Sequence, residues 1–193
     1  MPELVLASTS AYRRELVGRL GISCTAVAPR CDEEALKDPR LGPSELALHL
    51  AREKARSVAG QWPDAFVLGS DQLVEIDGQI LGKPGSTERA LEQLTRLAGQ
   101  AHRLITAFAL LCPGGAVLEH VDVHVLSMRP LSRDELARYV SADRPLDCAG
   151  SYKIEALGIS LFERIKGADF TAIMGLPLVA LTSTLRAQGF TLP

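Results

Sequence analysis

The segment Gly69-Ser70-Asp71-Gln72 constrains this chain more than any other, because it places a carboxylate directly after an apolar run. The run, Ala65 to Leu68, contains Phe66-Val67-Leu68, which is typical of a buried strand. Asp77-Gly78 is a strong two-residue hairpin signal that follows Leu73-Val74-Glu75-Ile76. We therefore expect a buried strand that continues into an antiparallel hairpin.

The second arm of this hairpin is expected to bring a lysine back to the carboxylate. Regular antiparallel pairing places Gln72 opposite Lys83, one residue from Asp71. Because side chains alternate along a strand, Lys83 would point to the side of Gln72. A bulge at Gly69-Ser70, or the long stem of the lysine, would then have to close the gap. A simple surface ion pair at a strand end is the alternative interpretation.

The composition predicts one globular domain over residues 1–193. The chain is 47% hydrophobic and 23% charged, and its length allows one sizeable core. The formal net charge of −2 and the lack of a basic block argue against a nucleic-acid partner, so any bound polyanion should be small.

The cysteine pattern and the short apolar stretches lead us to expect a cytoplasmic protein. The four cysteines have no C-x-x-C spacing and are expected to be reduced. No stretch reaches the roughly 18 consecutive apolar residues of a membrane helix, and no basic region precedes a signal-peptide core. We therefore expect no membrane partner.

Hydrophobic periodicity and turn signals predict an α/β architecture. Ser132 and Glu135 have the spacing of a capping box, which indicates a helix start. The expected strands are 4–7, 24–28, 66–68 with the hairpin arm 73–76, 104–111, 117–125 and 159–165, and the expected helices are 11–20, 44–59, 87–98, 132–140 and one beginning near Pro177. Because hairpins occur among strand–helix units, the sheet should not be purely parallel.

A cluster of hydroxyls and cations follows the first strand. Ser8-Thr9-Ser10 precedes Arg13 and Arg14 at the start of a predicted helix. Cations there oppose the helix dipole unless an anion lies between them and the free backbone N–H groups, so a phosphate site is one interpretation. The other is that Ser8 or Ser10 is a plain N-cap beside two solvated arginines.

One lysine lies inside an apolar helical stripe. Lys54 falls on the stripe of the 44–59 helix, so its stem points toward the body of the protein. Its ammonium either escapes to water or reaches a partner. Glu33 lies in the preceding polar loop, where no local pattern identifies a role.

A lysine and a glutamate two residues apart lie in the 147–155 segment. On an extended segment, Lys153 and Glu155 would share one side and either pair or jointly meet a ligand. A weak local salt bridge is the alternative. In the 120–124 strand, by contrast, His120 and His124 would be roughly 13 Å apart, too far for both to hold one zinc ion.

Taken together, the motifs resemble the Maf family of nucleoside triphosphate pyrophosphatases over essentially the full chain. Gln72, the aromatic Tyr12 and Lys153-Ile154-Glu155 are similar to the subfamily that acts on 7-methyl-GTP. Ala11 departs from the pattern, since proline is common there. The motifs that carry the resemblance are 7–10 with 13–14, 32–33, 53–55, 69–71, 82–84, 149–152 and 175–177.

The resemblance implies a mixed twisted sheet flanked by helices, in two lobes with a cleft between them. It also implies hydrolysis of 7-methyl-GTP to 7-methyl-GMP and diphosphate, a role in cleaning the nucleotide pool. The alternatives are dTTP/UTP or ITP/XTP as substrate, or a non-catalytic nucleotide-binding regulator of cell division. Family members often form homodimers, although no sequence stripe marks an interface.

The same resemblance implies roles for the phosphate-binding residues. Arg13, Arg14, Lys54 and Lys83 would neutralise the triphosphate as its α-phosphorus is attacked. Asp71 would accept the proton of the attacking water. A divalent ion, Mg²⁺ or Mn²⁺, is expected to bridge the phosphates, held by Glu33 and Asp71. Whether Asp71 is base, metal ligand or both stays open, and Ser8 joins the substrate-binding set.

The expected base contacts follow from the chemistry of 7-methylguanine. Tyr12 would stack on the cationic ring, a contact worth about 0.5 to 2 kcal/mol. Glu155 would accept the two donors of the N1/N2 edge, and Gln72 would add a hydrogen bond. Lys153 completes the substrate-binding residues.

Overall fold

The fold is built on a mixed β-sheet, as the hairpins and strand–helix units predicted. The structure is a computed structural model that describes residues 2–192. Within these residues, seven strands form one sheet in the order β2-β1-β3-β5-β6-β7, with β4 paired to β3. The strands are β1 (Leu4–Ala7), β2 (Cys24–Val27), β3 (Phe66–Ile76), β4 (Gln79–Leu81), β5 (Ala101–Leu111), β6 (Val117–Met128) and β7 (Phe162–Lys166).

Both parallel and antiparallel pairs occur in this sheet. β1 pairs in parallel with β2 and with β3, whereas β3–β4 and β6–β7 are antiparallel. The helices are α1 (Ala11–Gly18), α2 (Pro43–Ala59), α3 (Thr87–Leu97), α4 (Arg133–Asp143), α5 (Phe170–Ile173) and α6 (Leu178–Ala187). The sequence predicted all of them except the short α5.

The chain divides into two compact units, in agreement with the two lobes that were expected. Unit 1 comprises the residues up to Asp71, Thr106–Asp122 and the residues from Asp169 on. Unit 2 comprises Gln72–Ile105 and Val123–Ala168. Strands β3, β5 and β6 each contribute residues to both units.

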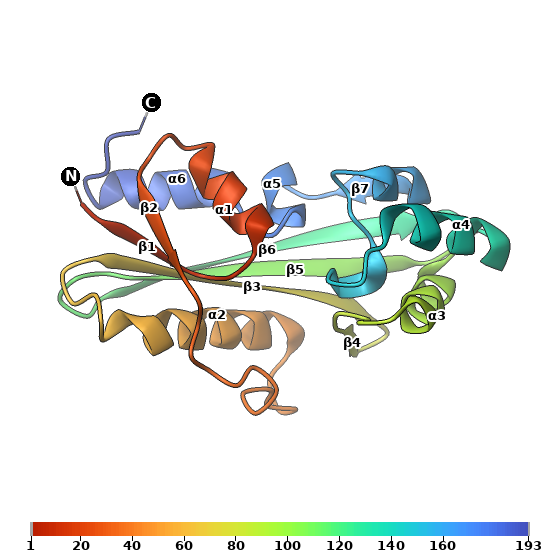
Figure 1. Ribbon diagram of the computed structural model, residues 1–193, viewed down its shortest axis with the longest axis horizontal. Helices are drawn as coiled ribbons and strands as arrows, with labels where there is room; N and C mark the ends of the chain where they lie inside the picture. Colours follow the sequence, from red (N-terminus) through yellow and green to blue (C-terminus); the bar gives the residue numbers. More distant parts are fainter. Residues whose placement is uncertain (1, 193) are drawn as a thin grey trace. The chain divides into compact units, whose positions relative to one another are not determined.

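In unit 1, helices cover both faces of the sheet, with α2 on one face and α1 and α6 on the other (Figure 1). Alternate residues of β1 therefore face different layers. Leu4 and Leu6 lie in the same core cluster as residues of α1 and α6. Val5 and Ala7 cluster instead with residues of α2. Burial on both faces explains the continuous apolar character of β1.

A close approach between α2 and the sheet in unit 1 depends on Gly69. A Cβ atom added to this residue would lie 2.0 Å from the carbonyl oxygen of Ala51 and 2.8 Å from the backbone nitrogen of Ala55, both in α2. These atoms are backbone and cannot rotate away. The absence of a side chain at this position therefore sets the distance between β3 and α2.

Contacts along β3 alternate without interruption up to Asp71. Gly69 and Asp71 meet α2, while the intervening Ser70 donates a hydrogen bond to the carbonyl of Gly175 on the other face. The bulge at Gly69-Ser70 that the sequence allowed is thus not needed within this part of the strand.

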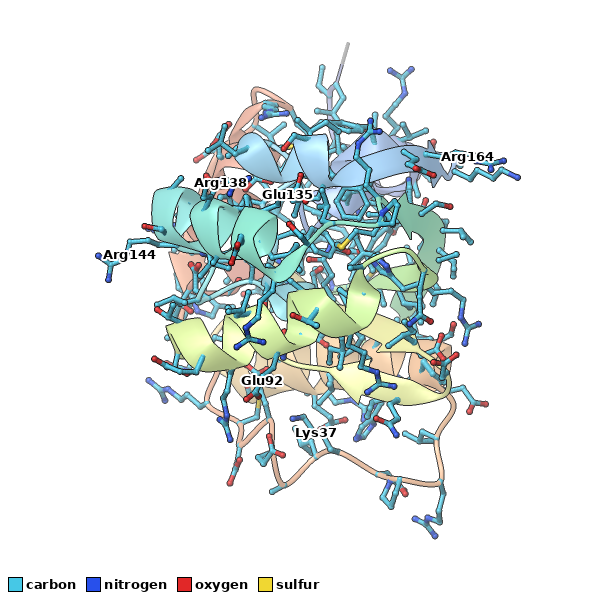
Figure 2. All side chains as sticks on the ribbon, turned by 90° about the vertical axis from the view of Figure 1, so that its right-hand side faces the viewer. Lys37, Glu92, Glu135, Arg138, Arg144 and Arg164 are labelled. Carbon is cyan, nitrogen blue, oxygen red and sulfur yellow. The ribbon has the colours of Figure 1, made fainter. Side chains whose placement is uncertain are left out.

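Unit 2 contains the hairpin and the helices α3 and α4, which lie side by side (Figure 2). Asp77 and Gly78 have φ values of 51° and 76°, as a two-residue hairpin turn requires, and Ile76 pairs with Gln79 as predicted. The capping box of Ser132 and Glu135 at the start of α4 is also confirmed.

The predicted strand at 159–165 is wrong in its first half. Residues Leu157–Leu161 form the 3-10 helix η2, and only Phe162–Lys166 form a strand, paired with the end of β6. A short apolar run does not distinguish a strand from a helical turn, which explains the error. A second 3-10 helix, η1, spans Ala149–Ser151.

Two further expectations concern thiols and membrane helices. The four cysteines, Cys24, Cys31, Cys112 and Cys148, are all free. No helix within residues 2–192 has the length and apolar character needed to cross a membrane.

The contact at Gly69 makes a direct prediction about stability. Gly69→Ala should lower the free energy of unfolding by about 1 to 3 kcal/mol, because the added methyl group must push α2 away from β3. The measurement is urea denaturation monitored by circular dichroism.

The matched control for this variant is Gly60→Ala at the end of the same helix. Gly60 has a helical φ of −61°, and no atom lies within 4 Å of an added Cβ. This variant should be neutral or slightly stabilising. Equal loss of stability in both variants would contradict the packing role of Gly69.

Candidate active site

The first strand and helix of unit 1 present the predicted hydroxyls and arginines. Ser10 is the N-cap of α1, where its Oγ accepts a hydrogen bond from the backbone nitrogen of Arg13. The Oγ of the buried Ser8 accepts from the backbone nitrogen of Ser10 at 3.1 Å. The N-cap interpretation is therefore confirmed for Ser10, and Tyr12 lies half-buried on the first turn of the helix.

The two arginines of α1 have different surroundings. Arg13 is half-buried, and its Nε donates a hydrogen bond to the carbonyl of Gly175 at 3.0 Å. Burial lowers the pKa of the Arg13 guanidinium, an effect opposed by the negative charges of Asp71 and Glu33. Arg14 is exposed, and its guanidinium makes no hydrogen bond or ion pair with the described residues.

The centre of the site is an ion pair between α2 and β3. The Nζ of Lys54 lies 2.6 Å from Oδ1 of Asp71, and both side chains are less than a tenth exposed. The same ammonium lies 2.9 Å from Oε2 of Glu33, whose side chain is 54% exposed. The question that the apolar stripe left open is thus answered, because Lys54 reaches partners instead of escaping to water.

The charges of this cluster compensate one another. Lys54 and Arg13 contribute two positive charges, and Asp71 and Glu33 contribute two negative charges. Burying either member of the Lys54–Asp71 pair alone would cost several kcal/mol, so the two side chains depend on each other. An incoming polyanion could compete with the carboxylates for both cations.

Glu33 and Asp71 are also the residues that were expected to hold a metal ion. Their carboxylates contact one ammonium, so their oxygens lie close enough together to serve one divalent cation once the ammonium has moved. This donor set fits Mg²⁺, which is commonly bound by one or two carboxylates together with substrate phosphates. In the described part of the chain, no group of three His, Cys, Asp or Glu side chains could hold a metal ion.

In unit 2, the hairpin ladder ends earlier than expected. The last pair is Val74–Leu81, so the predicted pairing of Gln72 with Lys83 does not form. The carbonyl of Gly82 accepts instead from Nε2 of Gln93 in α3, and Pro84 has no N–H to extend the ladder. Lys83 is exposed, and its return to Asp71 stays a prediction.

The expected geometry of the Lys153–Glu155 segment is wrong. The segment is a turn rather than an extended strand, because the backbone nitrogen of Ala156 donates to the carbonyl of Lys153. Gly158 packs on this turn, since an added Cβ would lie 2.3 Å from the oxygen of Lys153. The two side chains therefore do not share one side by strand alternation.

Lys153 and Glu155 also have separate environments. The Nζ of Lys153 donates to the carbonyl of Asp143 at 3.1 Å, at the C-terminus of α4, where the helix dipole favours a cation. Its backbone nitrogen donates to the hydroxyl of Tyr139. Glu155 is exposed, and the expected local salt bridge between the two residues is not present within residues 2–192.

Sequence reasoning gave no role to two residues that organise the site and missed a third. Ser70 and Gly175 belong to recognised motifs, but the hydrogen bond between them joins residues 105 positions apart and leaves no local pattern. Asp169 was not singled out at all. The signal that could have found it is local, because Asp169 is the N-cap of α5 and bonds Thr171 two residues on.

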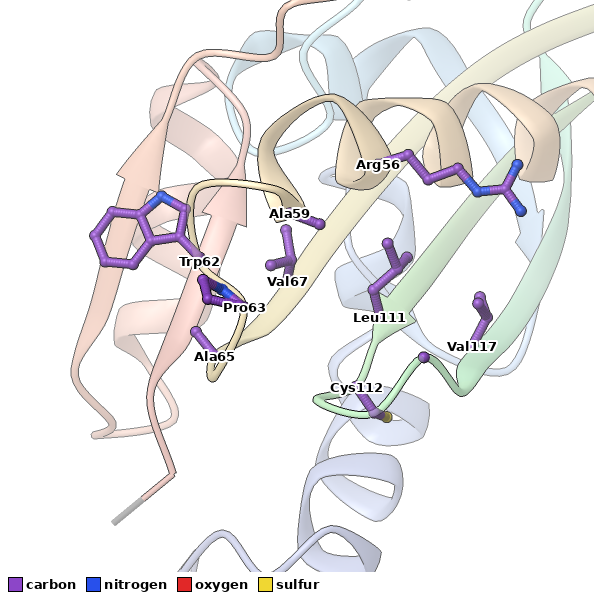
Figure 3. A pocket seen from close by; sticks show the side chains of 10 residues that line it. Arg56, Ala59, Trp62, Pro63, Ala65, Val67, Leu111, Cys112 and Val117 are labelled. Atoms are coloured by element: carbon purple, nitrogen blue, oxygen red, sulfur yellow. The ribbon is translucent and has the colours of Figure 1, made fainter.

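Unit 1 also contains an apolar pocket of about 230 Å³ that includes none of the predicted site residues (Figure 3). It lies where α2, the start of β3 and the β5–β6 turn meet, and its wall includes Trp62, Leu111 and Val117. The predicted site is therefore distinct from this pocket.

The chain is similar to known proteins in sequence and in fold. A 7-methyl-GTP pyrophosphatase from Xanthomonas campestris pv. campestris is 50% identical over 193 residues, covering 100% of both chains. One from Bdellovibrio bacteriovorus is 48% identical over 183 residues, covering 95% of both chains. The Ham1 protein of Staphylococcus aureus has a similar fold, with a TM-score of 0.55 and 12% identity over 96% of this chain and 99% of that chain.

The family model described as Maf-like protein matches residues 3–188, which include every predicted site residue. The chain therefore belongs to the Maf family.

Proposed function

We propose that this protein hydrolyses 7-methyl-GTP to 7-methyl-GMP and diphosphate and thereby cleans the nucleotide pool. The observation that carries the proposal is the 50% identity over full length with a 7-methyl-GTP pyrophosphatase. The buried Lys54–Asp71 pair supports it, because the site offers a carboxylate for water activation beside cations for phosphates.

The first part of the proposed mechanism concerns the charges in unit 1. The triphosphate competes with Asp71 and Glu33 for the ammonium of Lys54, since its total negative charge exceeds that of the two carboxylates. Arg13 and the exposed Arg14 offer guanidinium groups that can bind phosphate in a bidentate way. As its ammonium moves to a phosphate, Lys54 frees Asp71 to accept a proton.

The second part is the attack of water. Asp71 takes the proton of a water molecule that attacks the α-phosphorus, and the bond between the α- and β-phosphates breaks. Diphosphate leaves, and the cations stabilise the charge that develops on it. Lys83 is proposed as a further cation for this charge, and Ser8 as a hydroxyl that binds a phosphate oxygen.

A divalent ion, Mg²⁺ or Mn²⁺, completes the proposal. When bound, it would neutralise phosphate charge and polarise the bond that breaks. Glu33 and Asp71 would hold it, and the phosphates would supply further oxygens.

The residues proposed for base recognition are those that the family resemblance implies. The ring face of Tyr12 would stack on the cationic 7-methylguanine, and Glu155 would accept the donors of its N1/N2 edge. Gln72 and Lys153 would add hydrogen bonds. The net charge of −2 without a basic block favours this small polyanion over a nucleic acid. We further propose a cytoplasmic location and a homodimer.

The direct test is a substrate panel with Mg²⁺ or Mn²⁺. Purified protein is incubated with 7-methyl-GTP, GTP, ITP, dTTP and UTP, and the products are separated by chromatography. We expect preferential cleavage of 7-methyl-GTP to 7-methyl-GMP and diphosphate. Preference for dTTP or UTP would refute the substrate assignment, and no hydrolysis of any nucleotide would refute the enzymatic function.

Replacing the proposed general base should nearly abolish turnover. Asp71→Asn keeps the size of the side chain but cannot take a proton from water, so kcat should fall by about 10²- to 10⁴-fold. Some stability should also be lost, although Lys54 retains its contact with Glu33. The measurements are steady-state kinetics and thermal unfolding. A folded variant that retains more than about one per cent of activity would argue against this role.

Replacing the proposed base-reading carboxylate should change specificity. Glu155→Gln removes the charge at an exposed position, so activity on 7-methyl-GTP should fall more than activity on ITP or UTP. The control is Glu92→Gln on the outer side of α3 (Figure 2), which should leave the ratio unchanged. An equal loss of activity on every nucleotide would exclude a role of Glu155 in specificity.

A further inference from the structure

A single buried carboxylate in unit 1 holds together the segment that joins α5 to α6. Oδ1 of Asp169 accepts hydrogen bonds from the backbone nitrogen and the hydroxyl of Thr171, at 2.9 and 2.6 Å. Its other oxygen accepts from the backbone nitrogen of Val179 at 2.7 Å. Asp169 is 5% exposed, so these three bonds satisfy a charge that is nearly removed from water. The two ends of the segment are thus fixed to one side chain.

Thr171 closes the same segment a second time. Its hydroxyl, which donates to Asp169, accepts from the backbone nitrogen of Leu178 at 2.9 Å. The backbone between these residues is further fixed by Thr106 of β5, whose hydroxyl donates to the carbonyl of Ala172 at 2.8 Å. The connection between the two helices therefore has little freedom to move.

The enclosed turn directs the carbonyl group of Gly175 toward β3 and α1. Gly175 has a φ of 118°, a conformation that other residues rarely adopt. Its oxygen accepts from Nε of Arg13 and from Oγ of the fully buried Ser70, both at 3.0 Å. The carbonyl is thus held by β3 on one side and contacts the arginine of α1 on the other.

This contact decides which edge of the guanidinium remains for a ligand. With Nε bound to Gly175, the two terminal nitrogens of Arg13 are left, and they make no hydrogen bond to any of residues 2–192. These two nitrogens form one of the edges of a guanidinium that can bind a phosphate or carboxylate in a bidentate way. The negative charges of Asp71 and Glu33 act on the same guanidinium, which places it beside the proposed phosphate site.

We propose that Asp169 is a positioning residue for Arg13, acting through Thr171 and the carbonyl of Gly175. Asp169 touches no reacting atom; it fixes the turn whose carbonyl orients the guanidinium toward the phosphates. The inference rests on the proposed function insofar as the ligand of Arg13 is a nucleoside triphosphate. If Asp169 were only the cap of the four-residue helix α5, its loss would affect stability alone.

The test is a double-mutant cycle with Asp169→Asn and Arg13→Ala, using kcat/KM for 7-methyl-GTP. Asn has a single side-chain oxygen, so it cannot accept from both Thr171 and Val179. Asp169→Asn should lower kcat/KM by about 10- to 100-fold, as expected for a misplaced binding group. In the Arg13→Ala background it should cause no further loss, because its effect passes through the arginine. Full multiplication of the two losses would overturn the proposal.

Two further variants separate positioning from general stability. Thr171→Val keeps the shape of the side chain but removes the hydroxyl, and it should reproduce the effect of Asp169→Asn, whereas Thr171→Ser should restore kcat/KM. Ser132→Ala removes the N-cap of α4 in unit 2, so it should lower the melting temperature while keeping kcat/KM within about twofold of the wild type. An equal loss of kcat/KM in Ser132→Ala and Asp169→Asn would contradict positioning.

A spectroscopic measurement tests the positioning without relying on activity. The Nε–H signal of Arg13 in a ¹H–¹⁵N NMR spectrum is assigned with Arg13→Lys, and its exchange with water is measured. Exchange should be slow in the wild type and at least about tenfold faster in Asp169→Asn, since breaking its hydrogen bond exposes the group. Unchanged exchange would overturn the proposal, whereas a wild type that cleaves no nucleotide would overturn only the proposed function.

Discussion

The close approach of α2 to β3 at Gly69 is the constraint on which the rest of unit 1 depends. The backbone of α2 lies where a side chain of residue 69 would otherwise be. Nζ of Lys54 in the helix and Oδ1 of Asp71 in the strand therefore lie 2.6 Å apart, and both side chains are buried from water. Burying an ion pair costs desolvation free energy that can exceed the gain from its attraction, and removing one partner costs even more. The presence of the pair is therefore not explained by fold stability alone. We propose that the pair serves catalysis, because phosphates that attract Lys54 would free the carboxylate of Asp71 to accept a proton.

A second support acts from the opposite face of the sheet. Ser70 lies between Gly69 and Asp71 and points away from α2, where it binds the carbonyl of Gly175. The same carbonyl accepts a hydrogen bond from Nε of Arg13. Because side chains alternate along β3, Asp71 lies beside Lys54 on one face, and Ser70 lies on the other face beside the contact between Gly175 and Arg13. Three consecutive residues of β3 thus have three separate contacts: Gly69 packs on α2, Ser70 binds the carbonyl of Gly175, and Asp71 pairs with Lys54.

Much of this arrangement could be predicted from the sequence, and the failures have physical causes. The stripe on α2 showed that Lys54 points inward, but its partners come from distant segments that no local pattern records. The Lys153–Glu155 segment was taken as extended because its turn depends on the packing of Gly158 against the backbone of Lys153. The 159–165 run was ambiguous between strand and 3-10 helix. Asp169 has a local signal in its cap contact with Thr171, but its bond to Val179, ten residues on, leaves no local pattern.

The central proposal is that a water molecule attacks the α-phosphorus of a nucleoside triphosphate, and isotope labelling tests this most directly. The reaction is run with 7-methyl-GTP in water enriched in oxygen-18, and the products are analysed by mass spectrometry. We expect one oxygen-18 atom in 7-methyl-GMP and none in diphosphate. Label in the diphosphate, or formation of a nucleoside diphosphate and phosphate, would show attack at another phosphorus and contradict the account.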